Sequence, residues 1–375
     1  MTRGKRIRIL QVIDNLGAGG AQELLLGLGK HINKGEFQLD VCCLHGTGMY
    51  AKEIGDLGLQ VYSLSHIKSN PLIPLLLLKL IRGKGYQILH LHLEASTICG
   101  AIAGRLGGTP RIVATIHGLR EQFPSWFLPL CATLSPLFDK FVAEVQLSRK
   151  ELIEEGIPEA KIEYIPIGTD FFDRINRENR RAILRDEFGI DEGTPLILSI
   201  ARLHKHKGHI YLIKAMADVV RKVPAAKLMI VGDGPMRPAL EKATAQLGLT
   251  RNVIFAGFRR DLMALYSACD VLAMPSVREA LGIVTIQAMA CARPVVAFNV
   301  GAMSEAIIHG DTGLLVPPRD ASALAQALVR LLKEPLLRKE LGLRAKAFVR
   351  ENFDLKALVR KYEELYKALC MGISR

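Results

Sequence analysis

Two positively charged side chains, Arg202 and Lys207, stand on the short loop Arg-Leu-His-Lys-His-Lys-Gly, which ends at Gly208. The loop follows an apolar run and precedes an amphipathic one, so it connects a predicted strand to a predicted helix. A guanidinium makes paired hydrogen bonds to phosphate oxygens and an ammonium adds a point charge, so this loop suits a phosphorylated ligand. A solvated basic loop is the alternative that these residues alone leave open.

A second stretch with chemical character runs from Ser276 to Ala290 and enters a predicted helix near Gly282. The N–H groups at a helix start lack partners and lie at the positive end of the helix dipole, so residues 281–284 suit a diphosphate. The carboxylate of Glu279, just before the helix, could accept hydroxyl groups of a sugar. Gln287, about two turns into the helix, could reach a ribose. A plain acidic residue at a helix start would explain Glu279 as well.

Short apolar runs alternate along the chain with longer helical patterns, and this alternation predicts the elements that position these residues. Strands are expected at 7–13, 39–44, 61–64, 88–93, 111–116, 141–145 and 163–165 in the first half. In the second half they are expected at 196–201, 227–231, 253–256, 271–274, 294–297 and 313–316. Continuous apolar strands separated by helices indicate parallel sheets covered on both faces.

The fold class predicted from this pattern is α/β, with two doubly wound domains that face a cleft. The apolar series stops near 170–179, so we expect an N-terminal domain at 1–172 and a C-terminal domain at 173–350. Ligands of such sheets bind outside the carboxyl ends of the strands. The last segment, 351–375, has apolar residues at helical spacing, and we expect this helix to return to the N-terminal domain.

Composition narrows the range of partners. The formal net charge of +13 attracts anions, which leaves either a basic soluble surface or contact with an anionic membrane. Aromatic residues make up 6% of the chain and Trp126 is its single tryptophan, which argues against nucleic acid as a partner. Seven cysteines without a C-x-x-C pair indicate a reducing compartment and no zinc site. No apolar run approaches the ~20 residues of a membrane span, so we expect a cytoplasmic protein, with the inner face of the cytoplasmic membrane as a candidate location.

Taken in order, several motifs resemble those of the retaining glycosyltransferases of family 4, which have the GT-B fold. The family frame E-G-x-G-x-x-x-x-E-A-M-A is similar to the stretch from Glu279 to Ala290, with Gln287 in place of the second glutamate. Further matches are the Arg and Lys-Gly of the basic loop, Gly-x-Gly at 232–234, the double glycine at 19–20 and Thr-x-His at 115–117. The resemblance covers nearly the whole chain.

The resemblance implies a role for each matching position. Arg202 and Lys207 would hold the donor diphosphate, Glu279 would contact the transferred sugar, and His117 would face the reacting centre from the other domain. The remaining donor-binding positions implied are Gly19, Gly20, Gly232, Leu281, Gly282, Ile283, Val284 and Gln287. Contacts to the base are expected from the loop that carries Phe258. A strand-end histidine without a ligand is the alternative for His117.

The expected activity is transfer of a sugar from a nucleotide-diphosphate sugar to a glycan or lipid-linked acceptor. The chain holds no Asp-x-Asp pair, which the other main glycosyltransferase architecture uses to hold a metal ion. We therefore expect no metal and no cofactor, and the resemblance implies retention of anomeric configuration. The alternatives are a sugar-nucleotide epimerase or hydrolase, and a non-catalytic scaffold subunit. Gln287 favours the scaffold, although an amide can still bind ribose hydroxyls.

Two apolar segments of the N-terminal half bear on the acceptor. One is the leucine-rich stretch 71–82, and the other is the stretch 123–130 around Trp126, which continues to 138. Either could enter a membrane interface, helped by the positive charge. Helices that simply cover the core are the alternative.

Overall fold

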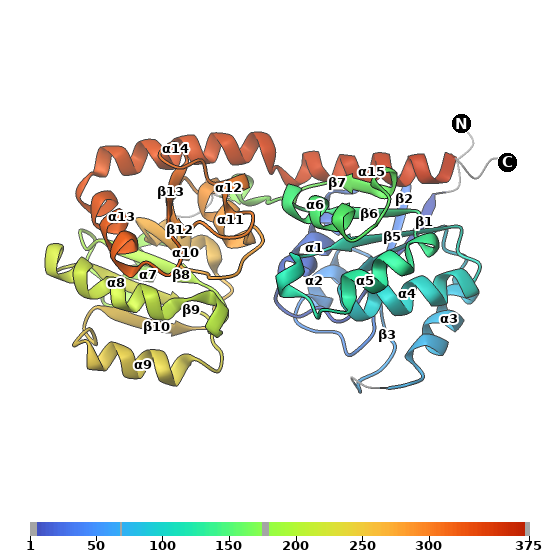
Figure 1. Cartoon of the computed structure of the whole chain (residues 1–375), viewed down its shortest axis with the longest axis horizontal. Coiled ribbons are helices and arrows are strands. Elements are labelled where there is room, and N and C mark those ends of the chain that lie inside the picture. Colours follow the sequence, from blue (N-terminus) through green and yellow to red (C-terminus); the bar gives the residue numbers. More distant parts are fainter. Residues whose placement is uncertain (1–5, 68–69, 175–179, 372–375) are drawn as a thin grey trace. The chain divides into compact units, whose positions relative to one another are not determined.

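The computed structural model describes residues 6–67, 70–174 and 180–371. The chain forms two compact units, the first made of Met1–Gly168 and Leu355–Arg375 and the second of Thr169–Asp354. Each unit is built on one parallel sheet with helices around it (Figure 1). This confirms the predicted α/β class with two doubly wound units. That they face a cleft stays a prediction.

The first unit has a seven-stranded sheet of order β3-β2-β1-β4-β5-β6-β7. Its strands are β1 (Ile7–Ile13), β2 (Phe37–Cys43), β3 (Gln60–Ser63), β4 (Ile88–His92), β5 (Arg111–Ile116), β6 (Lys140–Ala143) and β7 (Ile162–Tyr164). Its helices are α1 (Gly20–His31), α2 (Ala51–Asp56), α3 (Ile73–Lys84), α4 (Glu94–Leu106), α5 (Phe127–Thr133), α6 (Gln146–Glu154) and α15 (Leu355–Met371). Helices α1 and α15 share a core with one face of the sheet, and α3, α4 and α5 cover the other.

The second unit has a six-stranded sheet of order β10-β9-β8-β11-β12-β13. Its strands are β8 (Leu196–Ile200), β9 (Lys227–Val231), β10 (Val253–Gly257), β11 (Val271–Met274), β12 (Val295–Phe298) and β13 (Gly313–Val316). Its helices are α7 (Arg180–Glu187), α8 (His209–Lys222), α9 (Arg237–Gln246), α10 (Leu262–Ala268), α11 (Ile283–Ala290), α12 (Met303–Ala306), α13 (Ala321–Lys333) and α14 (Pro335–Asn352).

Strand order defines where ligands are expected. In the first unit β1 lies between β2 and β4, and in the second β8 lies between β9 and β11. The chain therefore winds outward in both directions from β1 and from β8. Loops at such a switch point diverge to opposite sides of the sheet and leave a crevice at the carboxyl edge. The sequence places the loops after β8 and β11, with Lys207 and Glu279, at this point of the second unit.

The C-terminal helix packs on the N-terminal unit, as predicted. Leu358, Val359, Tyr362 and Tyr366 of α15 are at most 3% exposed and share a core with α1. The two helices approach closely at Gly27, where an added Cβ would lie 2.5 Å from the side chain of Leu355. The glycine therefore sets the spacing between α1 and α15.

The sequence pattern predicted no helix at Glu94–Leu106, where the structure has α4. Its residues are mainly small or polar, so a regular apolar stripe is missing from Glu94–Leu106. Small residues are needed because the helix lies close to the sheet. An added Cβ would lie 2.4 Å from Leu91 at Gly100 and 2.7 Å from Leu89 at Gly104. The close approach of α4 to the sheet requires small residues, and these residues leave no apolar periodicity from which a helix could be predicted.

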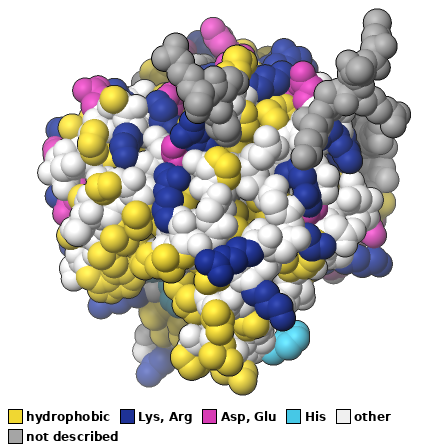
Figure 2. Space-filling model, turned by 90° about the vertical axis from the view of Figure 1, so that its right-hand side faces the viewer, with side chains coloured by type: hydrophobic (Ala, Val, Ile, Leu, Met, Phe, Trp, Pro, Cys, Tyr) yellow, Lys and Arg dark blue, Asp and Glu magenta, His cyan; other side chains and the backbone are white. Residues whose placement is uncertain are grey.

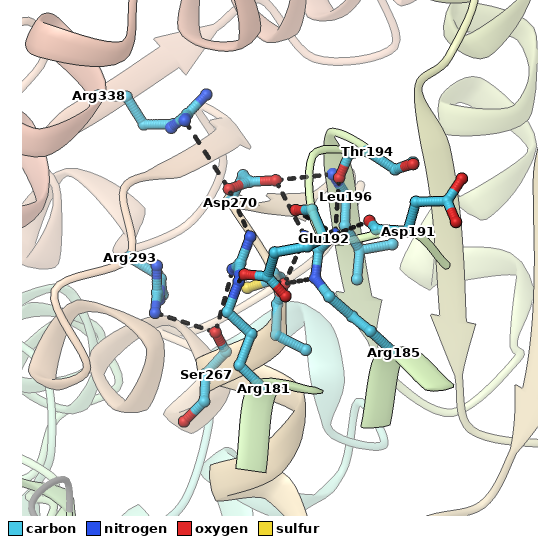
Figure 3. Close-up of polar contacts among 12 residues, drawn as sticks. Arg181, Arg185, Asp191, Glu192, Thr194, Leu196, Ser267, Asp270, Arg293 and Arg338 are labelled. Atoms are coloured by element: carbon cyan, nitrogen blue, oxygen red, sulfur yellow. Dashed lines mark hydrogen bonds and ion pairs between the residues drawn. The ribbon is translucent and has the colours of Figure 1, made fainter. Parts of the chain in front are cut away.

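Helix α7, which opens the second unit after the predicted boundary region, is fixed by a cluster of charges (Figure 3). Arg185 is 1% exposed and donates to the carbonyl groups of Asp191 and Thr194 at 2.7 and 2.9 Å. Asp270 accepts from the backbone N–H of Leu196 at 2.8 Å and lies within 3.8 Å of Arg181, Arg185 and Arg338. Of the boundary region predicted at 170–179, residues 175–179 lie outside the described part of the chain.

The two apolar segments of the N-terminal half form helices that contribute to the core. Ile73, Leu77 and Ile81 of α3 are buried, as are Phe127 and Leu128 of α5. Large apolar side chains nevertheless lie outside the core: Leu75 of α3 is 62% exposed, and Trp126, the residue before α5, is 52% exposed. In the part of the chain that is described, no helix combines the length and the hydrophobicity that crossing a membrane requires.

Candidate donor site and histidine site

The loops that follow β8 and β11 cross each other closely. The backbone N–H of Val277 donates to the carbonyl of His206 at 2.8 Å. Gly208 has φ +65°, and an added Cβ there would lie 1.9 Å from the carbonyl oxygen of Pro275. Only glycine fits a left-handed position with a carbonyl at that distance. The crossing brings together two segments that are about seventy positions apart in the sequence.

The crossing places Lys207 beside Glu279. The Nζ of Lys207 donates to Oε2 of Glu279 at 2.5 Å, and the two side chains are 16% and 8% exposed. The hydroxyl of Ser276 donates to the same oxygen at 3.1 Å. Both contacts fall on Oε2, and neither of them occupies Oε1. The sequence predicted these two residues as site members, and the structure shows that they form one ion pair.

Helix α11 begins at the same place. Gly282, with φ +73°, precedes it, and no described side chain caps its start. The N–H of Thr285 donates to the carbonyl of Gly282 at 2.9 Å, while the N–H groups of Ile283 and Val284 come too early in the helix to have partners inside it. Leu281 is 2% exposed, so at this position only backbone groups are suited to a ligand. The helix start has the properties of an anion site.

Other predicted donor residues lie on the neighbouring loops of the same edge. Arg202 follows β8 and its side chain is exposed. Gly232 follows β9, where an added Cβ would lie 2.0 Å from the carbonyl oxygen of Ala201, so the β8 and β9 loops also touch. Phe258 follows β10 and is 57% exposed. The structure thus gathers these residues along one edge of the second sheet.

Gln287 differs from this group because its side chain points into the second unit. It is 1% exposed, and its amide oxygen accepts from the hydroxyl of the fully buried Tyr266 at 3.1 Å. The predicted contact with a ribose stays a prediction. The partner, Tyr266 on α10, was not found from sequence, because nothing in the local pattern connects it to α11.

Burial lowers the pKa of two histidines at the basic loop, His206 and His209. His209, the first residue of α8, is 2% exposed, and burial, with a smaller effect from Lys207, lowers its pKa to about 4. Burial and the same lysine also lower the pKa of His206. At neutral pH both rings are therefore uncharged, and the positive charge of the loop comes from its lysines and Arg202.

In the first unit the predicted residues lie on the loops after β1 and β5. Gly19 precedes α1 and Gly20 begins it. His117 follows β5, and its Nε2 lies 2.9 Å from Nδ1 of His92. Its Nδ1 lies 3.0 Å from Oε2 of Glu144, which is the distance of an ion pair although the contact is not an aligned hydrogen bond. The side chain of His117 is only 6% exposed.

Sequence reasoning missed His92, Glu144 and Ser276. The alternation His-Leu-His at the end of β4 was the available signal for His92, since alternate residues of a strand share a face. Glu144 follows β6 directly, where a polar residue ends an apolar run. Ser276 lies within the stretch that was singled out, but its contact with Glu279 depends on the local turn.

Two doubly wound units, one of them with a cation, a carboxylate and an uncapped helix start at its switch point, define an α/β protein of the two-domain Rossmann-like class. Residues 18–171 match the family described as Glycosyltransferase Family 4, and residues 180–348 match Glycosyl transferases group 1. The chain belongs to this family of glycosyltransferases.

Proteins that are similar in sequence to this chain are also named as glycosyltransferases. A GDP-mannose-dependent alpha-(1-6)-phosphatidylinositol monomannoside mannosyltransferase of Mycolicibacterium smegmatis is 30% identical over 281 residues, 72% of each chain. Alpha-D-kanosaminyltransferase of Streptomyces kanamyceticus is 33% identical over 205 residues. That match covers 54% of this chain and 53% of the relative, so it spans about half the length of that protein. The crystal structure of Anabaena Alr3699/HepE in complex with UDP and glucose is 23% identical with a TM-score of 0.86, and the match covers 96% of this chain and 100% of that one. This likeness shows the fold, which is GT-B.

Proposed function

We propose that the protein transfers a sugar from a nucleotide-diphosphate sugar to a glycan or lipid-linked acceptor. The observation that carries this proposal is the Lys207–Glu279 pair beside the uncapped start of α11, at the switch point of the second sheet. Family membership supports it. So do the names of a relative that depends on GDP-mannose and of a neighbour in complex with UDP and glucose.

In this proposal the donor diphosphate lies at the start of α11, where backbone N–H groups and the helix dipole favour negative charge. Lys207 and the exposed Arg202 add two positive charges at the same edge, which is the basis for proposing transfer without a metal ion or another cofactor. Oε1 of Glu279 accepts a hydroxyl of the transferred sugar, while Lys207 and Ser276 hold Oε2.

Retention of anomeric configuration is proposed from family membership. The new bond to the acceptor oxygen would form on the face from which the diphosphate leaves. The acceptor hydroxyl would give its proton to a leaving phosphate oxygen, so that charge and atoms balance without a protein base.

Donor binding and turnover test the proposal separately. We expect UDP-glucose or GDP-mannose to raise the melting temperature of the second unit, because a ligand that binds only the folded state stabilises it. Glu279→Gln keeps an acceptor for Lys207 and Ser276 but removes the charge, and we expect binding to persist while turnover falls. Absence of stabilisation by every donor tested would refute the proposal. Donor binding without transfer to any acceptor in membrane extracts would favour the scaffold role, and donor conversion without acceptor would favour an epimerase or hydrolase.

We also propose that the first unit contacts an anionic membrane at the inner face of the cytoplasmic membrane, where a lipid-linked acceptor would lie. Leu72, the residue before α3, and Leu75 on the outer face of α3 are 56% and 62% exposed, and the exposed Lys79 and Arg82 follow. Figure 2 shows hydrophobic and basic side chains next to one another on a face of the molecule. Such a combination suits apolar insertion with attraction to anionic lipid.

Vesicle binding tests the membrane contact. We expect the emission of Trp126, the single tryptophan, to shift with phosphatidylglycerol vesicles and not with phosphatidylcholine vesicles. Replacing Leu72 and Leu75 by glutamine should weaken this binding, whereas Leu336→Gln, at an 82% exposed position of the second unit, should not. Equal binding of all variants would refute the assignment of this face.

A further inference from the structure

A line of buried polar side chains crosses the first sheet toward His117. Gln11 of β1, His90 and His92 of β4 and Thr115 of β5 are all at most 1% exposed. Gln11 pairs with His90 across the sheet, and His92 pairs with Thr115. His90 and His92 are two positions apart, so their side chains share one face of the sheet. Helix α15 covers this face with Tyr366, which belongs to the same core.

These side chains form a continuous series of hydrogen bonds. From Thr115, Oγ1 lies 2.7 Å from Nε2 of His90, and Nδ1 of His90 lies 2.7 Å from the hydroxyl of Tyr366. The amide nitrogen of Gln11 donates to that hydroxyl at 3.2 Å, and the amide oxygen of Gln11 lies 2.7 Å from Nε2 of His92. The series thus runs from the C-terminal helix to β4.

His117 and Glu144 end this series. Nδ1 of His92 lies 2.9 Å from Nε2 of His117, and Nδ1 of His117 lies 3.0 Å from Oε2 of Glu144. The side chain of Glu144 is 10% exposed, and its other oxygen, Oε1, has no hydrogen-bond partner among the described residues. Both ring nitrogens of His117 therefore face protein groups of the same unit.

The order of donors and acceptors fixes the position of a proton. The amide oxygen of Gln11 only accepts, so Nε2 of His92 carries a hydrogen. Burial lowers the pKa of His92 well below its ordinary value, with smaller effects from His90 and His117, so the ring is neutral and its Nδ1 accepts from Nε2 of His117. Nδ1 of His117 then faces the carboxylate of Glu144. Two lone pairs at 3.0 Å would repel, so either Nδ1 of His117 or the carboxyl of Glu144 carries a hydrogen, although the contact is not an aligned hydrogen bond.

The opposite orientation of the Gln11 amide reverses the direction of the series but still leads to a hydrogen at the contact between His117 and Glu144. The amide nitrogen would then donate to Nε2 of His92, and Nδ1 of His92 would donate to Nε2 of His117. The hydrogen of a neutral His117 would again be on Nδ1, toward Glu144. In one orientation His117 is neutral with its hydrogen on Nδ1, and in the other a hydrogen is needed either on Nδ1 or on the carboxyl of Glu144 that faces it.

We propose that Glu144 is a positioning residue for His117, whose ring it holds with a proton on Nδ1, while Tyr366 fixes the ring plane through Gln11 and His92. The use of this arrangement in sugar transfer rests on the proposed function. The other titratable groups that face it are His90 on β4 and Tyr362 on α15, and burial raises the pKa of Tyr362 far above the neutral range. Among these side chains, Glu144 is the carboxylate that contacts the ring, and burial keeps His90 and Tyr362 uncharged at neutral pH.

The tautomer can be measured by NMR on the ligand-free protein labelled with 15N-histidine. The spectra correlate the carbon-bound hydrogens of each imidazole ring with its two nitrogens. The His117 signals are assigned with a His117→Gln variant. At neutral pH we expect a hydrogen on Nδ1 in the wild type. In Glu144→Gln the amide can donate to Nδ1, so we expect Nδ1 without a hydrogen and Nε2 with one. A bare Nδ1 in the wild type, or an unchanged tautomer in Glu144→Gln, overturns the proposal.

Two tyrosine variants distinguish an effect carried by the hydrogen-bond series from the general effect of losing a buried hydroxyl group. Tyr366→Phe removes the hydroxyl that links Gln11 to His90, and we expect the His92 and His117 signals to shift. Tyr86→Phe removes a buried hydroxyl that donates to Asp40 at 2.7 Å on the other face of the sheet, and we expect those signals to stay. Equal shifts in both variants would overturn the role of the series.

Turnover distinguishes this inference from the proposed function. If the wild type transfers sugar, Glu144→Gln should lower kcat roughly 10- to 100-fold, while KM for the donor stays within about twofold, as for loss of a group that orients another. A change in KM alone would contradict the positioning role. If the wild type transfers nothing but shows the protonated Nδ1, the proposed function fails and the assignment of Glu144 stands.

Discussion

Removing either partner of the Lys207–Glu279 pair should destabilise the second unit, because the partner that remains is a charge in a largely buried position. The two side chains are 16% and 8% exposed, and their atoms are 2.5 Å apart. Loss of one member of a buried pair costs about 3–5 kcal/mol, and the partial exposure of Lys207 favours the lower end. We therefore expect each of Lys207→Ala and Glu279→Ala to lower the free energy of unfolding by about 3 kcal/mol, or the melting temperature by roughly 6–12 °C.

The double variant tests whether this cost comes from the pair. Once one charge is gone, removal of the other costs less, so we expect a coupling of about 2 kcal/mol between the two sites. Calorimetry follows the second unit, while Trp126 fluorescence reports the first unit. The exposed pair Arg237–Glu241, with side chains 33% and 47% exposed, is the matched control, and its coupling should be at most about 1 kcal/mol. Additive losses at Lys207 and Glu279 would refute the reasoning.

Three further changes follow from the same contacts. Gly208→Ala should prevent the loop crossing and reduce donor binding, since its Cβ would lie 1.9 Å from the carbonyl oxygen of Pro275. Gly248 is the control, because it has φ +69° but open space where a Cβ would be added. For Gly248→Ala, calorimetry should show that the free energy of unfolding falls by only about 1 kcal/mol. Asp270→Ala leaves three arginines without their shared carboxylate and the backbone N–H of Leu196 unpaired. We expect urea unfolding to show a free energy of unfolding about 4 kcal/mol lower than in the wild type. Near-native stability would show instead that the cluster is solvated. Because burial lowers the pKa of His209 to about 4 and the unfolded value is near 6.5, the unfolded state binds more protons between these values. Stability should therefore fall by up to about 3 kcal/mol as the pH drops from 6.5 to 4, and His209→Phe should flatten this part of the pH profile.

The sequence by itself determined the class of fold and most of the strands. Buried parallel strands are continuous apolar runs, and the runs at 7–13, 111–116 and 271–274 have the bounds that were predicted. Local chemistry also singled out Lys207, Glu279 and the start of α11 as candidates, because a strand, a loop and a helix start are contiguous in the chain. Helix α4 was missed because its small residues lack an apolar stripe.

Contacts between segments far apart in the chain were decided only by the tertiary structure. The order of β8 and β11 in the sheet brings Lys207 to Glu279, and the burial of Gln287 against Tyr266 depends on how α10 packs on α11. The series from Tyr366 to Glu144 joins β1, β4, the ends of β5 and β6, and α15. A hydrogen-bond partner across a sheet is set by register and packing, which no local pattern of residue types encodes.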